Sequence, residues 1–458
     1  MSLIREDPEL DEPVEDVEQL VEYFRSGETP PEEWRIGTEH EKIGLLEESF
    51  EPVPFEGARG IAVLLETLIR EHGHEPLLDG ERPVGTAFEG ASITLEPGGQ
   101  LELSGAPLGT LHETCAEFQR HLALMKHVSA ECGISWLGLG IHPLADIEKV
   151  PRVPRERYGI MRGFLSARGE LASQMMHMTA TVQANLDYAS EADMAEKLAL
   201  ALRATPVVSA LWANSSISNG ARNGFASRRE WIWRHTDPER CGLLPFVFED
   251  EWGEGSAYRR YTEWALDVPM LFLQREGRHI ELGGLRFRDY LRQGFNDFKP
   301  RLLDWSVHLT TLFPQVRLKR VLEMRGADAV PPGLVCALPA IWKGLLYDAE
   351  ARADLARRLG SWSFGDVDRL HLDVARRGLG AEAPDGSVCE VARQLVDVAV
   401  AGLRRIGVRN RAGEDESLFL APLYEILDRG KSPGEQLLDH WEGSWNGRIE
   451  RLVEYARY

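Results

Sequence analysis

The chain has few cysteines for its length, and their spacing argues against two classes of protein. There are five in 458 residues, and none forms a Cys-x-x-Cys pair. A structural zinc site or a disulfide-rich secreted fold is therefore not expected. We expect all five to be free thiols, mostly buried, in a reducing compartment. They are Cys115, Cys132, Cys241, Cys336 and Cys389.

Positive charge and long apolar runs are also scarce. Lys and Arg number 52 against 73 Asp and Glu, so the net charge is −21. General nucleic-acid binding, which depends on neutralising phosphates with basic side chains, is therefore not expected. No apolar run approaches the roughly 20 residues that cross a bilayer, and the acidic first thirty residues lack the basic start and apolar core of an export signal. We expect a cytoplasmic protein without a membrane span.

Two acidic segments carry the most informative pattern that is present. In IGTEHEKIGL, Glu39 and Glu41 are two residues apart on a predicted strand. Side chains on a strand alternate between faces, so both carboxylates point the same way, with His40 and Lys42 behind them. A solvated strand face would also carry two glutamates, so this segment alone does not establish a site.

The second acidic segment is SITLEPGGQLELSG. Its Pro-Gly-Gly run predicts a tight hairpin in which Glu96 pairs with Gln100 and Thr94 with Glu102. Glu96 and Glu102 then share one face of the hairpin. Four carboxylates on neighbouring strands repel one another unless cations lie among them, and oxygen ligands of this kind suit Mg²⁺ or Mn²⁺. The two segments together predict a metal site.

The rest of the chain predicts an α+β protein. Helical periodicity is present over 14–25, 58–72, 110–132 and 190–203, and Pro206 is expected to end the last of these. Strands are predicted over 134–141, 179–186 and 265–273, a loop over 212–230, and mostly helices from 341 onward. We see no clear boundary, so we expect a single catalytic domain over 1–458, with an acidic N-terminal extension of about 1–14 and a helix-rich C-terminal part of about 341–458.

Eight segments of the chain are long, ordered and unlike common short patterns: IGTEHEKIGL, LEPGGQLELSGAPLGTLHETCAE, RYGIMRGFL, TVQANLDYASEADM, LWANSSISNG, ALDVPM, FPQVRLKRVLEMRGAD and ALPAIWKGLLYD. Through these segments the chain resembles a known family, the plant and proteobacterial type of glutamate-cysteine ligase. The likeness runs from about residue 15 to the C-terminus.

The resemblance implies a fold and a reaction. The fold is similar to that of glutamine synthetase: α+β, with a mostly antiparallel sheet that forms an active-site cup surrounded by helices. The reaction joins the γ-carboxylate of L-glutamate to the α-amine of L-cysteine through a γ-glutamyl phosphate, with ATP as co-substrate and Mg²⁺ as cofactor. It is the first step of glutathione biosynthesis. We further expect a monomer or homodimer, and the charge and hydropathy noted above predict no nucleic-acid or membrane partner.

The resemblance also implies which residues form the site. Five glutamates are implied to bind two or three Mg²⁺ ions: Glu39, Glu41, Glu96, Glu102 and Glu323. Three arginines are implied to be catalytic, since a planar guanidinium binds two carboxylate or phosphate oxygens at once: Arg162, Arg229 and Arg325. The nucleotide phosphates are implied to lie against Arg317, Lys319 and Arg320.

A further set of side chains is implied to bind the amino acids. Arg162 and Arg229 are implied to hold glutamate, and Tyr261 to line the cysteine pocket. The others are polar or apolar walls: Met176, Gln183, Asn185 and Trp342.

Two alternatives stay open at this stage. One is a related carboxylate-amine ligase that joins glutamate to a different amine, because few residues are needed to reshape an amine pocket. The other is a non-catalytic, redox-sensing binding protein on the same fold. For the second, Cys115 and Cys336 lie in TCAE and VCALPA, which resemble the positions of one regulatory disulfide of the plant enzymes. Free thiols remain the expectation for both.

Overall fold

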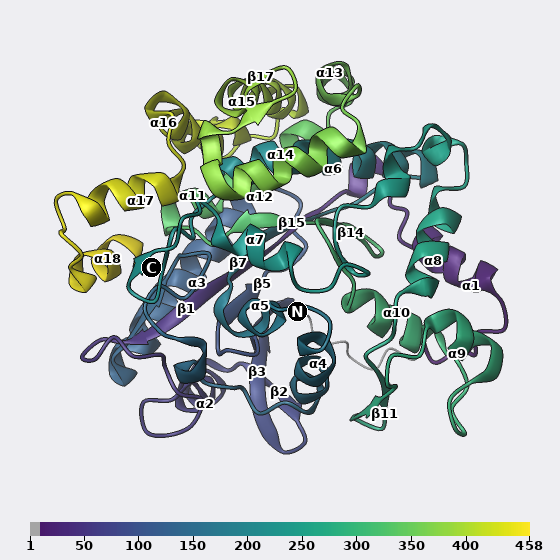
Figure 1. The fold of residues 1–458 in the computed structure, drawn as a ribbon, viewed down its shortest axis with the longest axis horizontal. Coiled ribbons are helices and arrows are strands. Elements are labelled where there is room, and N and C mark those ends of the chain that lie inside the picture. The colour runs from purple at the N-terminus through teal and green to yellow at the C-terminus, as the bar shows by residue number, and fades with distance from the viewer. Residues whose placement is uncertain (1–9) are drawn as a thin grey trace.

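The protein is built around one antiparallel sheet, which the computed structural model describes within residues 10–458 (Figure 1). Residues 1–9, with most of the predicted acidic extension, lie outside the described residues. In the described part the main sheet has nine strands in the order β14-β15-β7-β1-β5-β4-β3-β2, and β6 pairs with β1. Its strands are β1 (Ile36–Leu46), β2 (Glu75–Asp79), β3 (Arg82–Phe88), β4 (Ala91–Leu95), β5 (Leu101–Ser104), β6 (Ile134–Leu137), β7 (Thr181–Leu186), β14 (Val316–Leu318) and β15 (Leu322–Asp328).

Helices surround this sheet. They are α1 (Val17–Arg25), α2 (Ile61–His72), α3 (Leu111–Cys132), α4 (Glu156–Ser166), α5 (Ala172–Met178), α6 (Glu191–Leu211), α7 (Arg228–Arg234), α8 (Ala257–Asp267), α9 (Phe287–Gln293), α10 (Leu302–Thr310), α11 (Pro332–Val335), α12 (Ala337–Leu346), α13 (Ala349–Leu359), α14 (Phe364–Arg377), α15 (Val388–Ile406), α16 (Ala421–Arg429), α17 (Pro433–Glu442) and α18 (Ile449–Ala456). The remaining strands form two-stranded pairs: β8 (Ile217–Ser218) with β9 (Ala221–Arg222), β10 (Cys241–Gly242) with β13 (Phe313–Pro314), β11 (Phe272–Arg275) with β12 (Arg278–Glu281), and β16 (Glu382–Ala383) with β17 (Gly386–Ser387).

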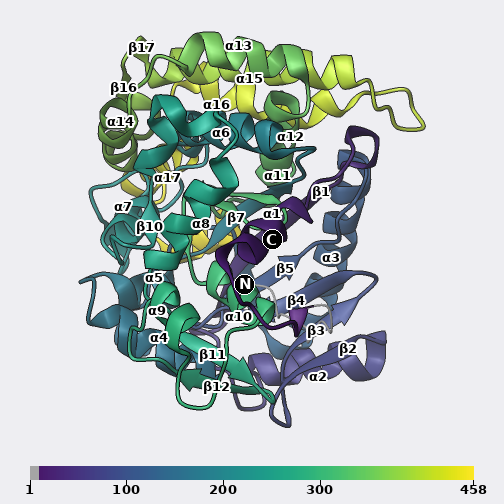
Figure 2. The ribbon, with the colours of Figure 1, turned by 90° about the vertical axis from the view of Figure 1, so that its right-hand side faces the viewer.

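Helices lie on both sides of the sheet and over one end of it. Figure 2 shows α3 on one side of the sheet and α4, α5 and α7 on the other, while α13 to α16 form a layer over one end. The largest apolar core cluster contains residues from Leu10 to Leu427, so α1 and the C-terminal helices share it. The division of the chain into domains stays a prediction. Among residues 10–458, no helix combines the length and the apolar character needed to span a bilayer.

The sequence predicts the ends of α3 closely. Thr110 is its N-cap and forms a capping box with Glu113, and Gly133 ends it with a left-handed backbone (φ 61°) that glycine adopts without strain. The chain then enters β6, which pairs antiparallel with the second half of β1. All pairings within the main sheet are antiparallel. The predicted fold class, an antiparallel sheet surrounded by helices, is therefore confirmed.

Three local predictions are wrong. The helix predicted to end near 203 continues through Pro206 to Leu211, because its last two turns are buried and packing against β15 and α14 outweighs the lost hydrogen bond. The strand predicted over 265–273 is the end of α8 followed by β11, because Ala265 and Leu266 continue the buried face of that helix. The loop predicted over 212–230 contains the β8–β9 hairpin and the start of α7.

The expectation of five free thiols is also wrong. Cys115 in α3 and Cys336, between α11 and α12, form a disulfide with a Cα–Cα distance of 5.9 Å. The two residues are 221 positions apart, so only the tertiary fold brings them together. Cys132, Cys241 and Cys389 are free, as expected.

Reducing this disulfide should destabilise the protein. The cross-link closes a long loop in the unfolded chain, so its loss should lower the free energy of unfolding by about 2–4 kcal/mol. Urea unfolding with and without dithiothreitol measures this, with Cys115→Ser as the mutational equivalent. Cys389→Ser, at a half-buried free thiol, is the matched control and should respond to reductant as the wild type does. A Cys115→Ser protein with wild-type stability would contradict the prediction.

Candidate active site

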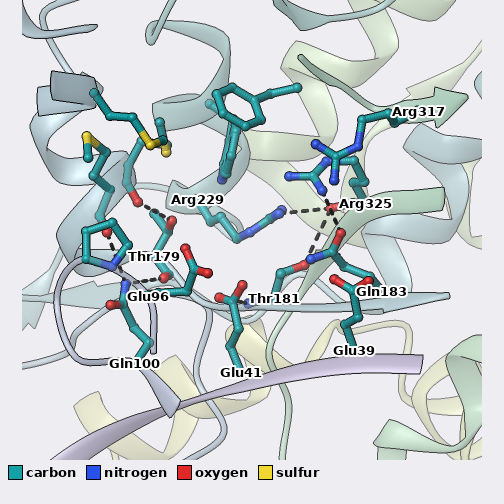
Figure 3. A pocket seen from close by; sticks show the side chains of 16 residues that line it. Glu39, Glu41, Glu96, Gln100, Thr179, Thr181, Gln183, Arg229, Arg317 and Arg325 are labelled. Atoms are coloured by element: carbon teal, nitrogen blue, oxygen red, sulfur yellow. Dashed lines mark hydrogen bonds between the residues drawn. The ribbon is translucent and has the colours of Figure 1, made fainter. Parts of the chain in front are cut away.

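One cavity brings together half of the predicted site residues (Figure 3). Its lining comes from β1, β7, β14, β15, α4, α5, α7, β13 and the turn between β4 and β5. Carboxylates lie on one side of the cavity and guanidinium groups on the other, as Figure 3 shows for Glu39, Glu41 and Glu96 against Arg229, Arg317 and Arg325. The cavity therefore brings opposite charges to face each other across a small space.

The acidic side is formed by β1 and the β4–β5 hairpin, in the predicted register. Thr94 is the partner of Glu102 across the hairpin, and the Glu96 amide donates to the Gln100 carbonyl oxygen at 2.9 Å. On the other side of β5, Glu102 lies opposite Glu41. One carboxylate oxygen from each of Glu41, Glu96 and Glu102 lies within 4.8 Å of the other two. Glu39 and Glu41 both line the cavity, so the predicted alternation of β1 is confirmed.

This acidic cluster fits a divalent cation. Burial raises the pKa of Glu41 well above its ordinary value, and the charges of Glu96 and Glu102 raise it further. Burial also raises the pKa of Glu39, with a contribution from Glu323. Buried carboxylates in mutual repulsion are stabilised by a cation, and an all-oxygen donor set is of the kind that binds Mg²⁺ or Mn²⁺.

The cationic side is held rigidly by hydrogen bonds. Arg229 is 3% exposed, and its guanidinium donates to the Arg325 carbonyl oxygen at 2.8 Å and to Glu230 at 3.2 Å. Arg325 in turn donates to the Gln183 side-chain oxygen at 2.8 Å. Two guanidinium groups are thereby fixed at the cavity before any substrate is present.

Glu323 lies among cations. Arg317 contacts its carboxylate at 2.6 Å, Lys319 contacts it at 2.7 Å, and Arg325 makes a third ion pair. Although burial by itself raises the pKa of Glu323, these three cations hold it well below the ordinary value. The carboxylate is therefore charged and positions Arg317 and Arg325, which both line the cavity. Its predicted role as a metal ligand stays a prediction.

Three further predicted residues lie at or beside the cavity. Met176 from α5 and Gln183 from β7 line it. Asn185, on the same face of β7, donates to Glu39 at 3.0 Å. The polar face predicted for this strand therefore points toward β1 and the acidic side.

Besides Glu102, Lys319, Glu323 and Asn185, which are described above, four predicted residues lie outside the cavity lining. Arg162 is on α4, and Arg320 stacks on the Tyr23 ring with a distance of 4.8 Å to its centroid. Tyr261 is fully buried and accepts a hydrogen bond from the Leu318 amide, and Trp342 is buried in α12. The roles assigned to these four side chains stay predictions.

Sequence reasoning missed several residues that line the cavity, among them Thr181 and Trp233. The amide of Thr181 donates to Glu41 at 3.0 Å, and Trp233 follows Arg229 by one helical turn. The spacing of Trp233 from Arg229 was a usable signal, because side chains four apart share a helix face.

The fold and the site together define the class of protein. The structure is similar to the crystal structure of a glutamate-cysteine ligase from Francisella tularensis in complex with AMP. The TM-score is 0.58 at 12% sequence identity, with 92% of this chain and 87% of that chain covered. The fold is therefore that of a glutamate-cysteine ligase.

Sequence comparison names the family. Residues 35–455 match the model of glutamate-cysteine ligase family 2 (GCS2), and the chain belongs to this family. The chloroplastic glutamate-cysteine ligase of Solanum lycopersicum is 41% identical over 444 residues, covering 96% of this chain and 82% of that protein. The chloroplastic enzyme of Arabidopsis thaliana is 40% identical over 444 residues, covering 96% of this chain and 83% of that protein. The resemblance stated from the motifs is confirmed.

The same sequence comparison shows that the expectation of a cytoplasmic location is wrong. The relatives from tomato and Arabidopsis are both named chloroplastic, and each matches over 96% of this chain. The expectation rested on the acidic composition of the first thirty residues, which argues against an export signal and does not by itself distinguish other compartments.

Proposed function

We propose that this cavity joins the γ-carboxylate of glutamate to the α-amine of cysteine, with ATP as phosphoryl donor and Mg²⁺ as cofactor. The observation that carries the proposal is the acidic cluster of Glu41, Glu96 and Glu102 opposite the fixed guanidinium groups of Arg229 and Arg325, in a chain of the glutamate-cysteine ligase family.

The arrangement suits carboxylate activation. A carboxylate is a poor electrophile, and phosphorylation by ATP converts it into an acyl phosphate that an amine can attack with release of phosphate. Phosphoryl transfer places the phosphate oxygens close to the glutamate carboxylate, so charge neutralisation is the main requirement. Arginine meets this need for charge neutralisation well, because one guanidinium group binds two oxygens in a plane. Arg229 and Arg325 would orient the reacting carboxylate and phosphoryl oxygens, and Arg317 would add positive charge at the same wall.

The acidic side would hold the metal. Glu39, Glu41, Glu96 and Glu102 would bind two or three Mg²⁺ ions, which neutralise phosphate charge when bound. Gln183 and Met176, which line the cavity between the two sides, would contact the amino acid.

The direct test is product formation by the purified protein. Incubation with glutamate, cysteine, ATP and Mg²⁺ should release ADP and give γ-glutamylcysteine by mass spectrometry, and omission of any one component should abolish the product. A panel of other amines in place of cysteine separates the second ligase alternative. Turnover with another amine and none with cysteine would overturn the cysteine assignment, and no turnover with any amine would favour the non-catalytic alternative.

Magnesium should stabilise the protein in a pH-dependent way. The raised pKa values of Glu39 and Glu41 mean that the metal-free folded protein loses stability as pH rises above the ordinary value of 4.5 toward the raised values. Protons compete with metal for these carboxylates, so Mg²⁺ should raise Tm more at about pH 8 than at about pH 5.5. Thermal unfolding with Mg²⁺ or with EDTA measures this, with potassium salt at equal ionic strength as the control. An equal shift at both pH values would contradict the prediction.

A further inference from the structure

The side chain of Gln100 connects the turn that carries Glu96 to the backbone of residues 179–181. Gln100 is 3% exposed and lines the cavity. Its Oε1 accepts a hydrogen bond from the Gly98 amide at 2.9 Å, and its Nε2 donates to the Thr179 carbonyl oxygen at 2.7 Å. Figure 3 shows this side chain beside Glu96, reaching toward Thr179.

The partners of Gln100 settle the orientation of its amide. The Gly98 amide can only donate, and the Thr179 carbonyl can only accept, so oxygen and nitrogen have one consistent placement. The Met176 carbonyl, 3.5 Å from Nε2, is a second acceptor on the same side. The amide of Gln100 is therefore fully used in joining two segments of backbone.

The second of these segments also holds Glu41. Two residues after Thr179, the amide of Thr181 donates to Glu41 Oε2 at 3.0 Å. The short segment 179–181 thus binds Gln100 at one end and Glu41 at the other. Glu96, four residues before Gln100, is tied to it by the backbone bond across the turn. Hydrogen bonds and the short covalent segment 179–181 therefore connect the backbone of Glu96, through Gln100, to the Glu41 carboxylate.

The turn itself is tightly packed on α5. A Cβ on Gly98 would lie 2.1 Å from the His177 carbonyl oxygen, so only glycine allows this approach. Gly99 has a φ of 82° and completes the turn. These backbone features set the shape of the turn, while the Gln100 amide sets its distance from the 179–181 segment.

We propose that Gln100 is a positioning residue for the metal site: its amide fixes the separation of the Glu96 and Glu41 carboxylates. This inference rests on the proposed function, because it assigns a metal to the acidic cluster. Both ends of the Gln100 amide are taken by backbone partners, so in this proposal it acts through Glu96.

Metal affinity tests this directly. Mn²⁺ replaces Mg²⁺ as the probe, because its free-ion electron paramagnetic resonance signal falls on binding. Gln100→Met keeps the length of the side chain and removes both hydrogen-bonding groups. It should weaken Mn²⁺ binding by about ten- to a hundredfold, the usual effect of removing an outer-shell partner.

A double-mutant cycle separates positioning from general structural damage. If Gln100 acts through Glu96, Gln100→Met should cost less than about twofold in a Glu96→Gln background, where the remaining carboxylates bind Mn²⁺ more weakly. A merely structural role would weaken binding equally in both backgrounds, and that result would overturn the inference. Gln100→Asn, which keeps the amide but shortens its reach, gives the same comparison if the Met variant does not fold by circular dichroism.

The matched control is Gln315→Leu. Gln315 is another buried glutamine, and its amide donates to Glu230 at 3.0 Å, outside the acidic cluster. This variant should bind Mn²⁺ within about twofold of the wild type.

The possible outcomes separate this inference from the proposed function. Wild-type Mn²⁺ affinity in Gln100→Met would overturn the role of Gln100 and leave the proposed function standing. A wild-type protein that binds Mn²⁺ but makes no γ-glutamylcysteine would overturn the proposed function alone, and one that binds no Mn²⁺ would overturn both.

Discussion

Replacing Glu41 by Gln should lower kcat for γ-glutamylcysteine formation by at least about a hundredfold, or about 2.7 kcal/mol of transition-state stabilisation. Glu41 lies opposite Glu102 in the β1–β5 pairing, and its carboxylate can approach those of both Glu96 and Glu102. Gln keeps the size of the side chain and an oxygen that accepts from the Thr181 amide, so the fold around it should persist. What it removes is a negative charge at the centre of the metal site.

Stability measurements distinguish this loss from misfolding. Because the pKa of Glu41 is raised by burial and by neighbouring carboxylates, neutralising it relieves repulsion in the metal-free protein. The metal-free Tm of Glu41→Gln should therefore equal or exceed that of the wild type, while its Mg²⁺-dependent rise should shrink. Glu51→Gln, at an exposed position just after β1, is the control for the substitution. Wild-type kcat in Glu41→Gln at saturating Mg²⁺ would place the metal elsewhere.

Replacing Arg229 by Lys should also lower kcat/KM for glutamate by about a hundredfold, although the charge is kept. The guanidinium of Arg229 contacts the Arg325 carbonyl and Glu230 while it lines the cavity. A lysine ammonium has one nitrogen and cannot satisfy these partners and face a substrate oxygen together. The substitution also removes the planar contact that a guanidinium group makes with two carboxylate or phosphate oxygens.

The neighbouring arginine gives a close control for this substitution. Arg228 begins the same helix, is half-buried, and stacks on the Phe225 ring at 4.9 Å from its centroid. Arg228→Lys should leave kcat/KM within about threefold of the wild type. Steady-state kinetics with glutamate varied at saturating ATP and cysteine measures both variants. Equal kinetics for Arg229→Lys and the wild type would remove Arg229 from the proposed site.

Part of the site was predictable because it follows from local rules. Alternation along β1 puts Glu39 and Glu41 on one face, and the Pro-Gly-Gly turn sets the register that pairs Thr94 with Glu102. Both depend only on backbone geometry over a few residues. The motifs around them were also long enough to indicate the family, which the comparisons confirm.

Other features were beyond local reasoning. Arg320 and Arg325 are five residues apart in one basic segment, but only Arg325 lines the cavity, because β15 carries it inward and Arg320 turns toward Tyr23. Trp342 belongs to a motif of the family and Tyr261 precedes another, yet the fold buries both outside the cavity lining. A motif identifies a segment, whereas the direction of each side chain depends on what the segment packs against.

The amino-acid sequence by itself determined the two acidic strands, their register and the family, since these depend on short-range periodicity and on the order of residues. Only the tertiary structure decided that Cys115 meets Cys336, that Arg229 joins Arg325 opposite the carboxylates, and that Gln100 links the turn to the 179–181 segment. Each of these contacts joins elements far apart along the chain or on different strands. Their closeness results from how the buried faces of the sheet and helices pack, and no local pattern encodes it.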